Sequence, residues 1–486
     1  MRNKVQRILF AAAEVAPFAK AGGLADVAGA LPRALSDLGL DVRIVLPLYR
    51  QIDRTRYAIR KRPERFTIRF DGLRHVVRVF ASTLPKSSVP VYFIDHPHYE
   101  GAGDIYYQDV TNQKDQQELQ VDRFLFFSRV IPEFLKALRW TPDVVHCHDW
   151  HTGAVPFFLA RSREMSRARR PATVYTIHNL PLQGSVAVQR FEELCEGTTQ
   201  DLRVPQAAIQ RGYINLTKLG LLTADALTTV SPTYAREILT SAGGAGLAGT
   251  LRRRRSNLSG ILNGLDIDAF NPATDSSIVN FTAQTLERRK KNTERLLRRG
   301  GLEPRRPVWG MVSRLTNQKG IDLVCEIIPR LVQWGGAIVL LGSGEPRLEQ
   351  RLAALSRRYP KQLFLTIGFD VTLAQQIYAG CDGFLMPSVF EPCGLGQLIA
   401  MRYGAIPIVR ATGGLRDTVT EGKTGFVFTR LTGTAFLAAC SRFLRLFRNQ
   451  TTWQALQRRA MGQDVSWSSP AKKYLRVYQK SVNRIP

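Results

Sequence analysis

The sequence lacks any hydrophobic run long enough to cross a membrane. No run approaches the roughly 20 consecutive apolar residues that a spanning helix needs, so we expect no integral membrane association. Basic residues precede an apolar run at the N-terminus, as in a secretory signal, but Glu14 and Lys20 interrupt the run. We therefore predict a first β-strand there.

Cysteines are few, and their spacing does not indicate a disulfide framework or a zinc site. A cytoplasmic, reducing location is the prediction. His146, His148 and His151 stand together after an apolar run, yet on a strand only the first two share a face, and no helical histidine pair accompanies them. We predict no metal site and no cofactor.

Acidic residues are scarce relative to basic ones, 40 against 68, which gives a net charge of +28. Such a charge is typical of nucleic-acid binding. The basic runs, such as those at 251–255 and 287–291, carry no interleaved aromatic residues and no nucleic-acid motif. We interpret most of the charge as solvated surface. The rest could attract anionic substrates or an acidic partner. We predict no nucleic-acid partner.

What the sequence does contain is strand and helix patterns in alternation. A chain of 486 residues with 44% hydrophobic composition needs two or three domains, and both halves alternate short apolar runs with helical periodicity. This is the pattern of doubly wound α/β domains. We predict a Rossmann-like domain at 1–245, a linker at 246–257 marked by glycine, alanine and arginine, and a second Rossmann-like domain at 258–466.

The stretch 383–415 carries the clearest chemical signal. Two apolar, strand-like runs flank a helical segment, so a strand, loop, helix, strand unit is predicted. Its loop would place Glu391 and nearby backbone N–H groups at the carboxyl edge of a parallel sheet, against a helix N-terminus that favours anions. A carboxylate beside a phosphate cradle suggests a phosphorylated sugar, whereas a simple helix cap is the alternative that these residues alone leave open.

Other strand ends carry cations and flexible backbone. Lys20 with Gly22 and Gly23 follows the first strand, and Arg314 with Lys319 follows another, a placement suited to a diphosphate. Taken alone, the spacing of Lys20, Gly22 and Gly23 is also typical of an ordinary turn. The pair Arg314 and Lys319, taken alone, is also typical of surface charge.

Nine motifs occur in one order along nearly the whole chain: KAGGLADV (20–27), HCHDWHTG (146–153), TIHNLPLQG (176–184), TTVSPTYAREI (228–238), GILNGLD (260–266), NPATD (271–275), VSRLTNQKG (312–320), FEPCGLGQL (390–398) and TGGLRDTV (412–419). Together they resemble the bacterial glycogen synthase family and its plant relatives, the starch synthases.

The resemblance implies a retaining glucosyltransferase of GT-B architecture, with two Rossmann-like domains facing across a deep cleft and a last helix, within 467–486, that crosses back to the first domain. It implies transfer of glucose from ADP-glucose to the non-reducing end of an α-1,4-glucan (glycogen or maltooligosaccharide), without a metal. The resemblance places Lys20, Gly22 and Gly23 in a donor-binding loop, Arg314 and Lys319 on the diphosphate, and Glu391 on the donor sugar, with the amides of Cys393, Gly394 and Leu395 beneath it. It also places His178 near the reacting centre, Asn263 in the cleft, and Glu14, Asp26, Asp149 and Trp150 on the sugar and acceptor side.

Four positions differ from the family pattern. Gly396 replaces a common Thr or Ser and Leu182 a common Tyr, while Val389 and Val465 replace a basic residue and Phe. We expect any change in acceptor preference or turnover to arise at the first two, which would lie near the cleft.

Retention without an evident nucleophile favours attack from the face of the leaving phosphate, while a double displacement through Asp149 or Glu391 stays open. UDP-glucose as donor, a small sugar acceptor, and a glucan-binding homologue with impaired catalysis are the alternative functions.

Overall fold

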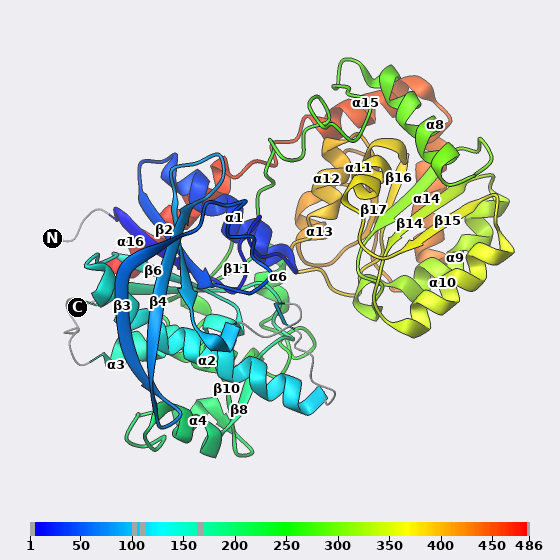
Figure 1. Cartoon of the computed structure of the whole chain (residues 1–486). Helices are drawn as coiled ribbons and strands as arrows, with labels where there is room; N and C mark the ends of the chain where they lie inside the picture. The colour runs from blue at the N-terminus through cyan, green and yellow to red at the C-terminus, as the bar shows by residue number, and fades with distance from the viewer. Residues whose placement is uncertain (1–4, 100–104, 107–112, 163–169, 484–486) are drawn as a thin grey trace. The chain divides into compact units, whose positions relative to one another are not determined.

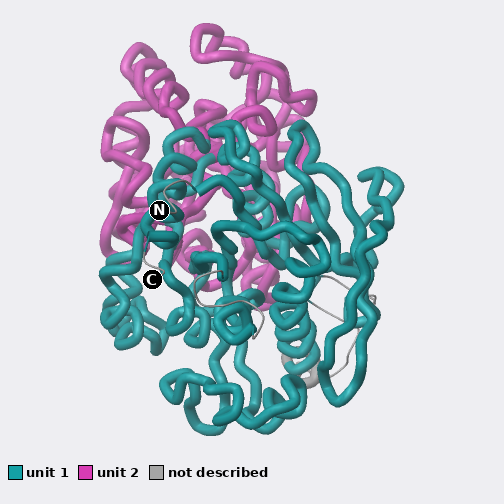
Figure 2. Tube along the Cα trace, turned by 90° about the vertical axis from the view of Figure 1, so that its left-hand side faces the viewer, with its two compact units in different colours: residues 1–230, 235–264, 467–486 teal, residues 231–234, 265–466 magenta. Residues whose placement is uncertain are grey.

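The computed structural model describes residues 5–99, 105–106, 113–162 and 170–483. Figure 2 shows its two compact units, one of residues 1–230, 235–264 and 467–486, the other of residues 231–234 and 265–466. Within the described ranges no helix is long and apolar enough to cross a membrane. All six cysteines are free thiols.

The first unit is built on a nine-stranded sheet of order β12-β11-β7-β6-β1-β2-β5-β4-β3. The sheet is parallel except for the hairpin strand β4, which is antiparallel to both neighbours. Its strands are β1 (Arg7–Ala11), β2 (Asp41–Pro47), β3 (Arg60–Phe70), β4 (Leu73–Thr83), β5 (Pro90–Asp95), β6 (Val144–His148), β7 (Ala172–Ile177), β11 (Ala226–Thr229) and β12 (Leu258–Gly260). The inner strands β6 and β7 are buried along their whole length, as expected for a parallel sheet covered on both faces.

The helices of this unit are α1 (Gly23–Ser36), α2 (Gln113–Leu138), α3 (Val155–Arg161), α4 (Val188–Cys195), α5 (Leu216–Thr223), α7 (Ala248–Arg253) and α16 (Ser468–Val482), while α6 (Pro232–Glu237) is shared with the second unit. A small antiparallel sheet joins β8 (Ser185–Ala187), β10 (Tyr213–Asn215) and β9 (Ile209–Gln210). The C-terminal helix α16, red in Figure 1, packs on β6, β7 and α1. Its Tyr478 hydroxyl lies 2.9 Å from Nδ1 of His146.

The second unit is a six-stranded, fully parallel sheet of order β15-β14-β13-β16-β17-β18, which is the Rossmann strand order 3-2-1-4-5-6. Its strands are β13 (Val308–Val312), β14 (Ala337–Gly342), β15 (Leu363–Ile367), β16 (Gly383–Met386), β17 (Ile406–Arg410) and β18 (Phe426–Phe428). Its helices are α8 (Arg289–Arg299), α9 (Ile321–Gln333), α10 (Pro346–Arg358), α11 (Val371–Gly380), α12 (Gly396–Arg402), α13 (Gly413–Thr418), α14 (Gly433–Phe447) and α15 (Gln450–Met461). The predicted strand, loop, helix, strand unit at 383–415 is confirmed as β16, α12 and β17.

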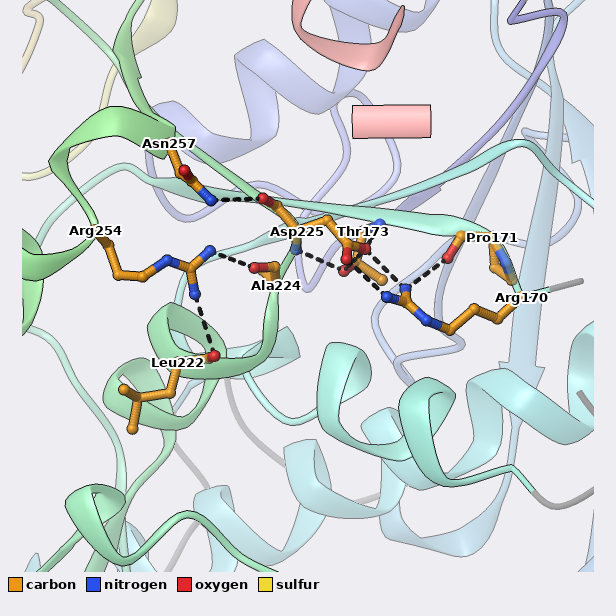
Figure 3. Close-up of polar contacts among 8 residues, drawn as sticks. All are labelled: Arg170, Pro171, Thr173, Leu222, Ala224, Asp225, Arg254 and Asn257. Atoms are coloured by element: carbon orange, nitrogen blue, oxygen red, sulfur yellow. Dashed lines mark hydrogen bonds and ion pairs between the residues drawn. The ribbon is translucent and has the colours of Figure 1, made fainter. Parts of the chain in front are cut away.

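The segment 246–257, predicted from composition to be a linker, is folded onto the first unit. It contains α7, whose Leu251 is fully buried. Arg254 anchors it, because the guanidinium donates to the backbone oxygens of Leu221, Leu222 and Ala224 at the end of α5, at 2.6–3.1 Å. Figure 3 shows the contacts with Leu222 and Ala224. A helix C-terminus presents unpaired carbonyl groups, so a cation there is stabilising. The linker was predicted from composition. Composition cannot show that Arg254, one arginine of a basic run, donates hydrogen bonds to backbone oxygens elsewhere in the unit.

Asp225 is the second anchor in this region. Its carboxylate accepts two hydrogen bonds from Arg170, at 2.7 and 2.8 Å, and two from Thr173, while its backbone oxygen accepts one from Asn257 (Figure 3). The Arg170 pair holds the pKa of Asp225 below its usual value despite burial. These contacts connect the starts of β7, β11 and β12.

We predict that Arg254→Met lowers the free energy of unfolding by about 2 kcal/mol, because three carbonyl acceptors lose a charged donor. Arg253→Met is the matched control, since Arg253 is exposed, and it should change stability by less than about 0.5 kcal/mol. Urea unfolding of both variants measures the difference. Equal effects would show that the segment does not depend on these hydrogen bonds.

Candidate functional site

Two strands of the second unit that are neighbours in space, β13 and β16, lead into the loops that carry its candidate residues. The sheet order reverses between these strands, and ligands of such sheets bind beyond the carboxyl ends at this switch point. Lys319 follows β13 and Glu391 follows β16, and their side chains meet, with Nζ 2.6 Å from Oε2. The Ser388 hydroxyl donates to the same carboxylate oxygen at 3.0 Å.

The Glu391 loop is held by close backbone approaches. A Cβ at Gly413 would lie 1.9 Å from the Glu391 carbonyl oxygen, and one at Gly414 would lie 2.2 Å from that of Cys393. Gly414 N–H donates to the Glu391 oxygen at 3.1 Å. On the other side, Gly320 packs on the Pro387 oxygen at a positive φ of 71°. Any side chain at these three positions would displace the loop, so the glycines fix where the carboxylate lies.

An anion would find unsatisfied donors beside this carboxylate. The backbone N–H groups of Gly394 and Leu395, which precede α12, have no acceptor in the described part of the chain. Arg314 is exposed and touches Gln318 at 3.3 Å, with no carboxylate partner among the described residues. The structure thus brings Glu391, Lys319 and the Gly394 and Leu395 amides to one sheet edge, with Arg314 free to reach it.

Gly396, one of the departures from the family pattern, is the first residue of α12. A Cβ there would lie 3.2 Å from the Phe384 ring and 3.4 Å from the Met386 sulfur. The position faces packed side chains of β16, so the space for a Thr or Ser is tight. Leu182, the other departure, is 55% exposed.

In the first unit, Glu14 binds the loop that follows β1. Its Oε2 accepts the N–H groups of Ala21 and Gly22 at 2.7 and 2.6 Å, and Oε1 accepts the Tyr106 hydroxyl. Glu14 is 3% exposed. The Gly22 amide, which the sequence suggested for a phosphate, therefore already has an acceptor. A Cβ at Gly23 would meet no other atom within 4 Å.

Lys20 and Asp26 lie at the same loop and pair with each other, with Nζ 2.6 Å from Oδ1. Both side chains are partly exposed, so this contact contributes little stability and leaves both groups accessible to a ligand.

Asp149 and His178 lie at the ends of the adjacent strands β6 and β7. Asp149, strained at a φ of 54°, accepts the His178 N–H through Oδ1 at 2.7 Å, and His178 Nε2 lies 3.0 Å from His148 Nδ1. Burial raises the pKa of Asp149 to about 7 and lowers that of His178 to about 3. At neutral pH His178 is thus an uncharged hydrogen-bonding ring.

Trp150 and Asn263 complete the predicted set. The Trp150 indole packs against Gly184, where a Cβ would lie 2.3 Å from the ring, so no larger residue fits. Asn263 is 9% exposed, and its side-chain oxygen has no partner among the described residues. A buried acceptor left open in this way is a candidate ligand contact.

Sequence reasoning missed three residues. Ser388 donates a hydrogen bond to Glu391 and lies only three positions before it, so this contact could have been considered from the sequence. Tyr106 reaches Glu14 across 92 positions, which no local pattern reveals. Phe369, 87% exposed, is a large apolar side chain just beyond the carboxyl end of β15.

Comparisons with known proteins agree along the whole chain. The family model of the starch synthase catalytic domain matches residues 7–253, and that of the group 1 glycosyl transferases matches residues 306–445. Glycogen synthase 2 of Geobacter sulfurreducens is 41% identical, covering 98% of this chain and 99% of its own length. Glycogen synthase of Desulforudis audaxviator is 41% identical over 100% of this chain and 98% of its own.

Among solved structures, the catalytic domain of starch synthase IV from Arabidopsis thaliana, bound to ADP and acarbose, matches with a TM-score of 0.90 and 34% identity. The match covers 99% of this chain and 100% of the plant chain. The predicted GT-B class with two Rossmann-like domains is thereby confirmed. The chain belongs to the glycosyltransferase family of the bacterial glycogen synthases and plant starch synthases.

Proposed function

We propose that the chain transfers glucose from ADP-glucose to the non-reducing 4-hydroxyl of an α-1,4-glucan and retains the anomeric configuration. The observation that carries this proposal is the Lys319–Glu391 contact at the switch point of the second sheet. The names of the bacterial relatives, and the ADP and acarbose in the plant structure, support the same substrate classes.

The donor diphosphate would meet Lys319, Arg314 and the free amides of Gly394 and Leu395. The leaving ADP gains negative charge as the glycosidic bond breaks. Cations and N–H groups held in place beforehand stabilise that charge without reorganising, which is often the largest catalytic contribution. Lys319 is only 18% exposed in its side chain, so water screens it weakly.

Glu391 would hold the donor glucose. Lys319 and Ser388 donate to Oε2, and no described residue donates to Oε1, so Oε1 is available to accept a sugar hydroxyl. An ammonium 2.6 Å from a carboxylate also weakens it as a nucleophile. This favours front-face attack, in which the departing phosphate takes the acceptor's proton, over a covalent intermediate on Glu391.

On the first unit, Asp149 would act as a positioning residue. Its Oδ1 accepts the N–H groups of His178 and Asn179, so it fixes the loop that carries the His178 ring. The ring, neutral because burial lowers its pKa, would bind a sugar hydroxyl as a donor or an acceptor rather than act as a cationic acid.

Phe369 offers a face for the donor base. It stands beside two further exposed apolar residues, Ile367 and Val371, at the carboxyl edge of the sheet. Stacking of a base on an aromatic ring contributes about 1–3 kcal/mol. The larger purine would gain more than a pyrimidine, which supports ADP-glucose over UDP-glucose.

We predict that Glu391→Gln and Lys319→Met each lower kcat for glucose transfer to glycogen by at least about 100-fold. Their ADP affinities should differ: Lys319→Met should weaken ADP binding about 10-fold through the lost charge, whereas Glu391→Gln should stay within about threefold. Lys290→Met, an exposed change on α8, is the control for both assays. Full turnover in either site variant would refute the assignment.

Asp149→Asn should reveal the penalty of burying this carboxyl group. Between about pH 4 and pH 7 the unfolded chain releases a proton that the folded chain keeps, so the carboxyl lowers the free energy of unfolding increasingly as pH rises. Asparagine cannot ionise, so the variant should gain about 2.5 kcal/mol of stability relative to the original chain between pH 5 and pH 8. Urea unfolding at both pH values measures the difference, in which the histidines common to both chains cancel. A difference that does not change with pH would contradict the raised pKa.

Phe369→Ala should reduce the preference for ADP-glucose over UDP-glucose. We expect kcat/KM for ADP-glucose to fall about 10-fold and that for UDP-glucose to fall less, since a pyrimidine stacks over a smaller area. Val371→Ala is the matched control for a nearby exposed apolar side chain. Equal losses with both donors would remove Phe369 from base recognition.

A further inference from the structure

A cluster of three histidines lies outside the residues assigned above. His75 is on β4, His96 follows β5 directly, and His98 lies in the 3-10 turn Pro97–Tyr99. One ring nitrogen from each lies within 4.8 Å of the others. Of the described residues, these three are the group of His, Cys, Asp or Glu whose ligand atoms gather closely enough for a metal ion. Two neighbouring antiparallel strands fix the positions of His75 and His96.

The tautomer of His75 suits a metal ligand. Its Nε2 lies 2.9 Å from the backbone oxygen of Phe70, which can only accept, so in the neutral ring the proton is on Nε2. Nδ1 then has a free electron pair, and it faces Nε2 of His96 at 3.1 Å. A histidine that donates to a carbonyl with one nitrogen and presents the other inward is the usual arrangement around a bound metal.

His98 supplies a second indication. Its Nε2 is shielded from solvent and has no hydrogen-bond partner in the described ranges. Buried polar atoms of this kind call for an explanation, and a coordinated ion would satisfy this one. The Phe126 ring packs on both His96 and His98, at 4.4 and 4.7 Å between ring centroids, and gives the cluster an apolar wall.

We propose that His75, His96 and His98 bind one divalent late transition-metal ion, with zinc as the best fit. Three imidazoles are a ligand set that zinc accepts, with water in the fourth position. Tetrahedral zinc with bonds of about 2.0–2.1 Å places its nitrogens about 3.4 Å apart, close to the 3.1 Å already present between His75 and His96. The His75–His96 pair would therefore expand slightly around an ion, and the ligand nitrogens that lie up to 4.8 Å apart would move closer together.

Binding through Nε2 of His96 has one identifiable cost. Nδ1 of that ring accepts the His98 N–H at 3.3 Å, a long hydrogen bond. Coordination requires the His96 proton to move from Nε2 to Nδ1 and this bond to be given up. Burial lowers the pKa of His96 to about 3 and that of His98 to about 4, so the rings are neutral at pH 7 and no proton has to be displaced into solvent.

The ion would restrain the 3-10 turn Pro97–Tyr99, which carries His98. Tyr99, next to His98, donates to the Arg123 backbone oxygen, and Tyr106 donates to Glu14. The site is separate from the proposed transfer chemistry, which needs no metal, so its expected role is to stabilise this part of the first unit.

The test is a calorimetric titration of the full-length, EDTA-treated chain with zinc chloride at pH 7.5. One ion per chain is expected, with a Kd below about 1 μM, and His98→Asn and His75→Gln should each weaken binding by at least about 100-fold. Zinc should also raise the Tm of the original chain and leave that of either variant unchanged. Cys195→Ser, which removes the half-buried thiol, should bind as the original chain does.

Absence of stoichiometric binding to the original chain would overturn the proposal, as would unchanged affinity in His98→Asn and His75→Gln. Circular dichroism establishes that each variant is folded. If one variant does not fold, the other decides. Loss of binding in Cys195→Ser would assign the ion to a thiol instead.

Discussion

Each of the two large sheets places the carboxyl ends of parallel strands from different parts of the chain side by side, and the candidate site depends on this constraint. In the first unit β1 lies between β2 and β6, and in the second β13 lies between β14 and β16. Helices cannot cover the gap where the strand order reverses. Loops after these strands therefore collect the polar groups, among them Glu14 and Asp149 in one unit and Lys319 and Glu391 in the other.

Close backbone packing fixes the position of the loop that carries Glu391. The Glu391 loop lies against Gly413, Gly414 and Gly320 at distances that admit no side chain. Lys319 then neutralises a carboxylate that is almost fully buried, and an unpaired charge there would be costly. The same ion pair leaves one oxygen of Glu391 open. Stability and the proposed sugar contact thus rest on the same residues.

Much of this could be predicted from sequence, for local reasons. The strand and helix at 383–415 were predictable because glycine and proline bound the short apolar runs, and Lys319 and Glu391 were identified because the motifs that contain them occur in the family's order. The contact between these two residues spans 72 positions and follows only from the sheet order. Arg254 in the expected linker, the Glu14 contact that occupies the Gly22 amide, and the histidine cluster depend on distant partners too, so composition and spacing could not reveal them.

The most direct test of the central claim is transfer of labelled glucose from ADP-glucose to glycogen by the purified full-length chain. The account predicts label in α-1,4-linked glucan, one ADP released per glucose transferred, and a lower rate with UDP-glucose. Glycogen binding without ADP release, in a folded chain that also binds ADP, would contradict it.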